Sequence, residues 1–150
     1  MAIDQATVSG YAVVDNGVIT QSGVWNLSDK KRSGESRGMR YIRLEKYLKD
    51  AHKTWNFDLV VHEQTLLRGG NATELANGFK AIILKFATEN GIEVSCVHAT
   101  ELKKFATGNG KADKLEMIAA CERLTGISPV DDNESDACLI GLWAWKKYGM

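Results

Sequence analysis

Three acidic residues stand in segments that otherwise read as apolar core. Asp4 lies in the first predicted strand, Glu63 ends an apolar strand, and Asp136 precedes an apolar helical run. A buried carboxylate without a partner costs several kcal/mol, so each acid needs a compensating group. Taken singly, each has a simpler interpretation: Asp4 would accept backbone hydrogen bonds, and Glu63 would be exposed at its strand end. Asp136 would cap a helix N-terminus together with Asp131 and Asp132.

Carboxylates that converge from different elements repel one another, and a bound divalent cation removes that repulsion. An all-oxygen acidic cluster selects Mg²⁺ or Mn²⁺ over zinc. Two such ions, about 3.5–4 Å apart, stabilise the attacking and the leaving oxygen in phosphodiester hydrolysis. Considered together and in this order along the chain, the three acids favour a metal site of that kind.

The charge distribution is compatible with a nucleic-acid substrate, although the net charge of the chain is zero. Residues 28–53 hold nine lysines and arginines against four acids, and residues 131–136 hold four acids and no base. A neutral total can therefore hide a basic surface and an acidic pocket. For the basic segment, the alternative is an ordinary solvated helix face.

Apolar periodicity and turn signals predict the elements that hold these acids. We expect strands over 2–4, 11–15, 18–24, 59–63 and 93–97, with a hairpin turn at Asp15-Asn16-Gly17. Helices are expected over about 41–55, 71–86, 112–124 and 132–148, with a helical turn over 100–104. This order predicts an α/β fold with a mixed five-stranded sheet, antiparallel hairpins first and parallel strands later, flanked by helices.

Length and composition predict a single domain over residues 1–150, because the chain is 44% hydrophobic and holds one proline. A run of about 18 apolar residues and a signal-peptide pattern are both missing, so we expect no contact with a membrane. Cysteines are odd in number and lack metal-ligand spacing, and we interpret them as reduced core thiols of a cytoplasmic protein. They are Cys96, Cys121 and Cys138.

Four segments, in register over nearly the whole chain, resemble the RuvC-like Holliday junction resolvases, a branch of the ribonuclease H-like nucleases. The segments are Ile3-Asp4-Gln5 with Gly10-Tyr11-Ala12-Val13, Val61-His62-Glu63-Gln64, Leu102-Lys103 with Gly108-Asn109-Gly110-Lys111-Ala112-Asp113-Lys114, and Asp132-Asn133-Glu134-Ser135-Asp136-Ala137. Each is weak alone, whereas four in order are specific. The short chain is similar to the compact members encoded by phages, which would place it in a bacterial or phage-infected cell.

The resemblance implies a ribonuclease H-like fold and a metal-dependent endonuclease. The enzyme would resolve four-way DNA junctions, and other branched DNA, by paired phosphodiester hydrolysis. Asp4 would bridge two Mg²⁺ ions, for which Mn²⁺ would substitute, with Glu63 and Asp136 as further ligands. A homodimer is implied as well, since two symmetric nicks across a junction match a twofold axis.

Two lysines would lie near the scissile phosphate by the same resemblance, Lys103 and Lys114. A positioned ammonium stabilises developing negative charge and binds the DNA backbone. An ordinary surface lysine is the alternative for both, and Lys104 competes with Lys103 for the role. Gly10 would let the turn between the first two strands pass close to the site.

The fourth metal ligand departs from the family pattern, which usually has an aspartate or histidine three residues before the last acid. That position is Asn133 here, a neutral oxygen donor. Asp132, four residues before Asp136, shares a helix face with it and is our preferred ligand.

The expected DNA-contacting residues are Leu66, Arg68 and Lys111, together with Lys103 and Lys114. Some members of the family carry an aromatic residue where Leu66 stands, which stacks at the junction centre. Leu66 would allow apolar wedging between bases but no aromatic stacking.

Other functions compete with junction cleavage. A ribonuclease H-like nuclease of other specificity would act on RNA–DNA hybrids or on transposon or flap ends with the same acids. A non-catalytic junction-binding protein would follow if Asn133 marked a lost ligand. An actin-like nucleotide-binding fold also pairs a first-strand acid with a nearby glycine, but the chain is short for its two lobes.

Overall fold

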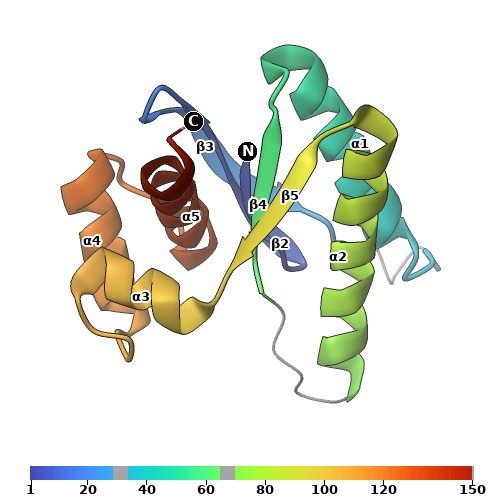
Figure 1. Cartoon of the computed structure of the whole chain (residues 1–150). Helices are drawn as coiled ribbons and strands as arrows, with labels where there is room; N and C mark the ends of the chain where they lie inside the picture. Colours follow the sequence, from blue (N-terminus) through green and yellow to red (C-terminus); the bar gives the residue numbers. More distant parts are fainter. Residues whose placement is uncertain (29–33, 65–69, 150) are drawn as a thin grey trace.

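A computed structural model describes residues 1–28, 34–64 and 70–149, except the side chains of residues 71 and 72. Leu66 and Arg68, which we expect to contact DNA, lie outside the described residues. The elements drawn in Figure 1 follow one another in the order β1 (Ala2–Asp4), β2 (Val8–Asp15), β3 (Val18–Asn26), α1 (Met39–Trp55), β4 (Leu59–Glu63), α2 (Gly70–Asn90), β5 (Glu93–Val97), α3 (Ala99–Thr107), α4 (Lys114–Thr125) and α5 (Asp132–Tyr148).

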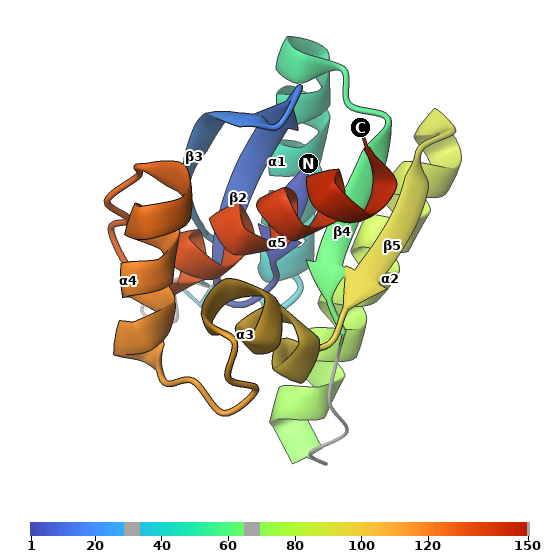
Figure 2. The same cartoon turned by 60° about the vertical axis from the view of Figure 1, so that its left-hand side comes forward.

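The strands form one five-stranded sheet in the order β3-β2-β1-β4-β5. β1 and β3 run antiparallel to β2, whereas β4 runs parallel to both β1 and β5. The predicted α/β fold with a mixed sheet is therefore confirmed. Helices α1 and α2 cover one face, and α3, α4 and α5 lie on the other, as Figures 1 and 2 show.

The alternation of side chains along β1 and β4 determines on which face of the sheet Asp4 and Glu63 lie. Ala2 of β1 and Val61 of β4 belong to the core under α5, whereas Ile3 belongs to the core under α1 and α2. Because side chains two residues apart share a face, Asp4 and Glu63 point to the α5 side. Both acids end their strands, so they meet at one edge of the sheet.

Helix α5 crosses the sheet on the face that carries these acids (Figure 2). Its buried residues include Ala137, Cys138, Leu139 and Ile140, as the apolar run predicts. The first turn is capped by Asp131, whose side chain accepts a hydrogen bond from the Glu134 amide. Asp131 therefore satisfies the helix end, and Asp136 is not needed as a cap.

The predicted element boundaries are corrected at several places. Strand β2 begins at Val8 and β3 runs on to Asn26, because these two residues pair with each other, and the strands stay paired from there to Asp15 and Val18 with a register shift between Val13 and Val14. The expected turn over 100–104 is the longer helix α3, and α4 begins at Lys114 because Asp113 caps it. Gly10 lies inside β2, where it pairs with Asp4, and not in the preceding turn.

The prediction of three core thiols is wrong for one cysteine. Cys121 and Cys138 are buried and free, but Cys96 is exposed. Cys96 lies in β5, which forms one edge of the sheet, and a strand at the edge is less covered than a central strand. None of the described helices is long and apolar enough to cross a membrane.

Candidate metal centre and nucleic-acid site

Three carboxylates meet at the edge of the sheet where β1 and β4 end. Asp4, Glu63 and Asp136 each offer one oxygen, and these oxygens lie within 4.8 Å of one another. Two come from adjacent parallel strands, and the third comes from the start of α5, which crosses above them. The structure thus brings together the three acids that the sequence singles out.

Burial and mutual repulsion make ionisation of these acids costly. Burial raises the pKa of Asp4 well above its ordinary value, and the charges of Asp136 and Glu63 raise it further. The pKa of Asp136 is raised to about 7, first by burial and then by the charges of Glu63 and Asp132. A divalent cation would offset this repulsion, and an all-oxygen donor set suits Mg²⁺ or Mn²⁺. The residues present therefore fit a metal of that class.

Lys103 is the lysine that α3 directs toward the acids. Its charge opposes the rise in the pKa of Asp136, which places the ammonium near that carboxylate. Lys103 is half-buried, whereas Lys104 is exposed on the same helix. Of these two neighbours, Lys103 is therefore the one whose charge acts on Asp136.

Lys114 is the first residue of α4, and its side chain contacts Asp132 at the start of α5. Its Nζ lies 3.4 Å from Oδ2 of Asp132. The side chain is 80% exposed, so it is accessible from solvent. Lys111, three residues earlier, is exposed in the loop between α3 and α4. Both lysines therefore present an ammonium group to solvent at the surface.

Asp132 acts electrostatically on the acidic cluster, whereas Asn133 bonds to a residue outside it. The charge of Asp132 raises the pKa of both Asp4 and Asp136, although its oxygens fall outside the 4.8 Å group. The amide of Asn133 instead donates to Oδ2 of Asp131, at 3.4 Å. The charge of Asp132 therefore acts on the cluster, whereas the side-chain amide of Asn133 is bonded to Asp131.

Gln5 and His62 form a polar support that our sequence analysis missed. Nε2 of Gln5 donates to the backbone carbonyl of Glu63 at 2.7 Å, and Nδ1 of His62 lies 2.8 Å from the same oxygen. His62 is buried, and burial lowers its pKa, which favours the neutral ring. The link ties the end of β1 to the end of β4 beside the acids. A histidine inside the apolar run of β4 was the available signal.

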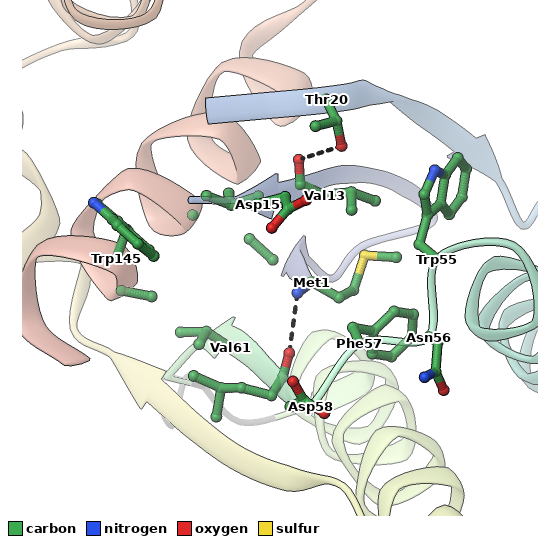
Figure 3. A pocket seen from close by; sticks show the side chains of 15 residues that line it. Met1, Val13, Asp15, Thr20, Trp55, Asn56, Phe57, Asp58, Val61 and Trp145 are labelled. Carbon is green, nitrogen blue, oxygen red and sulfur yellow. Dashed lines mark hydrogen bonds between the residues drawn. The ribbon is translucent and has the colours of Figure 1, made fainter. Parts of the chain in front are cut away.

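A separate cavity of about 380 Å³ lies where β1 and β4 begin, at the end of these strands opposite to Asp4 and Glu63 (Figure 3). Met1, Asp15, Trp55, Phe57 and Trp145 are among its lining residues. The amine of Met1 donates there to the backbone carbonyl of Leu59 at 3.0 Å. None of the three clustered acids lines this cavity, so it is distinct from the candidate metal centre.

Sequence comparison finds relatives of one kind. A crossover junction endodeoxyribonuclease RuvC from Synechococcus sp. (strain WH7803) is 22% identical over 138 residues, which are 91% of this chain and 90% of the relative. The protein of the same name from Corynebacterium jeikeium is 31% identical over 67% of this chain and 65% of the relative. The alignments with four corynebacterial relatives span 40–65% of those proteins' lengths. No protein-family model matches the chain.

Solved structures share the fold. Thermus thermophilus RuvC in complex with a Holliday junction substrate superposes with a TM-score of 0.77 at 19% identity, over 93% of this chain and 88% of that one. The yeast mitochondrial Holliday junction resolvase superposes with a TM-score of 0.60 at 14% identity, over 97% of this chain and 79% of that one. The expected ribonuclease H-like fold is thereby confirmed.

Proposed function

We propose that this chain, a RuvC-like protein of the ribonuclease H-like superfamily, is a metal-dependent endonuclease that resolves four-way DNA junctions. The observation that carries the proposal is the meeting of Asp4, Glu63 and Asp136, whose oxygens lie within 4.8 Å of one another. Relatives named crossover junction endodeoxyribonuclease support the reaction, and a RuvC structure bound to a Holliday junction supports the substrate class. Other branched DNA would be cut by the same site.

The metal would be Mg²⁺, with Mn²⁺ as a substitute, held by Asp4, Glu63 and Asp136 and completed by Asp132. When bound, the ions supply a water activated for attack and a positive charge at the leaving oxygen. Asp4 would be the ligand shared by two ions, as the resemblance implies, and the charges of Asp136, Glu63 and Asp132 all raise its pKa.

The lysines would act on the DNA and not on the metal. Lys103, beside Asp136, would stabilise negative charge that develops on the scissile phosphate. Lys114 would exchange its contact with Asp132 for a phosphate oxygen when DNA binds. Leu66, Arg68 and Lys111 complete the expected DNA contacts.

Two copies of the chain would act together. A four-way junction has strands related by a twofold axis, so paired nicks need two sites related in the same way. We therefore propose a homodimer. The homodimer would act in the cytoplasm of a bacterial or phage-infected cell.

The substrate class is tested with three labelled nucleic acids of matched length: a synthetic four-way junction, a linear duplex and an RNA–DNA hybrid. Each is incubated with the protein in Mg²⁺, in Mn²⁺ and in EDTA, and products are resolved on denaturing gels. Cleavage of the junction alone, with either metal but not in EDTA, is the expected result. Cleavage of the hybrid would indicate a nuclease of other specificity, and tight junction binding without cleavage would indicate a binding protein.

A further inference from the structure

Glu134 is a buried acid in the first turn of α5, between Asp132 and Asp136. It is 5% exposed. Its Oε2 accepts a hydrogen bond from the Ser22 hydroxyl at 2.7 Å, and its Oε1 accepts one from the Val130 amide at 2.8 Å. One side chain therefore joins α5 to β3 and to the segment that enters the helix.

The same residue takes part in the helix cap. The Glu134 amide donates to Oδ1 of Asp131 at 2.9 Å, so the cap and the carboxylate close the turn from both directions. This resembles a capping box in which the glutamate reaches one residue beyond the cap, to Val130. Both donors to the carboxylate are neutral, and the N-terminus of α5 supplies favourable positive potential.

The backbone of the neighbouring Asn133 packs against a different strand, β2. A Cβ on Gly10 of β2 would overlap the backbone carbonyl of Asn133, so helix and strand are in direct contact there. The first turn of α5 is thus held against β2 at Asn133 and against β3 at Glu134. Asp132 and Asp136 each lie two residues from Glu134, and a rotation of this turn would move both relative to Asp4.

We propose that Glu134 is a positioning residue, whose link from Ser22 to Val130 sets the orientation in which α5 presents Asp136 and Asp132 to the metal. The inference rests on the proposed function, because it assigns the purpose of the link to that metal centre. Glu134 does not belong to the oxygen cluster, and its two carboxylate oxygens accept hydrogen bonds from Ser22 and Val130. It acts through the helix that carries the ligands.

Two substitutions of Glu134 distinguish the loss of its hydrogen bonds from the loss of its negative charge. Glu134→Ala removes both acceptors, and we expect the Mg²⁺ concentration for half-maximal junction cleavage to rise about tenfold or more, as for other groups that orient metal ligands. Glu134→Gln keeps the link, because its amide oxygen accepts from Val130 and its amino group donates to Ser22. Its Mg²⁺ requirement should stay within about threefold of the wild-type value, well below the effect of losing an orienting group.

A second readout does not depend on cleavage. The Mg²⁺-dependent rise in melting temperature, measured without DNA, should need more metal in Glu134→Ala than in the wild type. Ile83→Ala serves as the control, because Ile83 is fully buried in the core between the sheet and helices α1 and α2. Its truncation lowers the stability of the protein without removing a contact of α5. This variant should melt earlier and keep the wild-type Mg²⁺ requirement.

A folded Glu134→Ala protein with the wild-type Mg²⁺ requirement in both assays would overturn the proposal, as would an equal shift in Ile83→Ala. If Glu134→Ala does not fold, Ser22→Ala removes one donor only, and an unchanged requirement there would overturn it. The proposed function fails separately, when the wild-type protein leaves the junction uncut at any Mg²⁺ concentration. The melting assay would then still report on the role of Glu134.

Discussion

Gly10 of β2 lies directly against the backbone carbonyl of Asn133 at the start of α5, with no room for a side chain between them. Gly10 is also the register partner of Asp4 across the pair of β1 and β2. One contact therefore sets the spacing between the strand that carries Asp4 and the helix that carries Asp136. The glycine is required by this close approach and not by a turn.

Gly10→Ala should force α5 away from β2. Overpacking of this kind costs about 1–3 kcal/mol, so we expect a lower melting temperature together with a higher Mg²⁺ requirement for cleavage. Gly38→Ala is the matched control, since a Cβ there meets only Oγ of Ser36 at an ordinary 3.5 Å. Wild-type melting and metal response in Gly10→Ala would show that the contact does not constrain the helix.

The identity of the fourth ligand is tested by Asp132→Asn and Asn133→Ala. Asp132 acts electrostatically on both Asp4 and Asp136, whereas the Asn133 amide is turned to Asp131. Asp132→Asn should therefore raise the Mg²⁺ concentration for half-maximal cleavage by about tenfold, the low end for loss of a metal-site group, and Asn133→Ala by much less. The reverse order in a Mg²⁺ titration would identify Asn133 as the ligand.

Lys103 and Lys104 form a matched pair on α3. Lys103 is half-buried beside Asp136 and Lys104 is exposed, so removal of the first should be the more damaging change. We expect Lys103→Ala to lower the rate at saturating DNA and Mg²⁺ about 100-fold or more, as for loss of a group that stabilises the transition state. Lys104→Ala should affect only the salt dependence of binding. Equal losses of rate in single-turnover assays would contradict this assignment.

The pH dependence of metal-free stability follows from the raised pKa of Asp136. The folded protein holds this pKa at about 7, against an ordinary 3.8, so folding favours the protonated acid. This stabilisation is fully present below about pH 4 and is lost as the pH rises through about 7. In EDTA, the melting temperature should therefore fall between pH 5 and pH 8, and it should fall less in Asp136→Asn.

The comparison needs two controls. Mg²⁺ at pH 8 should raise the melting temperature of the wild type more than that of Asp136→Asn, because the variant lacks a ligand. Asp50→Asn changes an exposed residue of α1 and should keep the wild-type pH profile. An identical fall in wild type and Asp136→Asn would mean that the carboxylate at this position does not carry the effect.

Local patterns predicted the parts of the fold that depend on local physics. The alternation of β1 and β4 places Asp4 and Glu63 on one face, and the apolar run of α5 is buried with Asp136 at its start. The order of strands and helices was sufficient for the mixed sheet. The pairing of Lys103 and Lys114 with the acids came from the resemblance, because no periodicity links these segments.

The contacts that hold the site together could not be predicted in this way. Ser22 and Glu134 are 112 residues apart, and their hydrogen bond depends on how α5 crosses the sheet. The choice between Lys103 and Lys104 depends on the rotation of α3 about its axis. Gly10 was misplaced because the turn before β2 is shorter than the pattern indicated.

Junction cleavage with each of the four strands labelled in turn tests the central claim most directly, comparing the wild type with Asp4→Asn in Mg²⁺. The account predicts nicks at symmetric positions in two opposing strands by the wild type. Asp4→Asn should show no nicks, although it still binds the junction. Undiminished cleavage by Asp4→Asn, or equal cutting of a linear duplex by the wild type, would contradict the account.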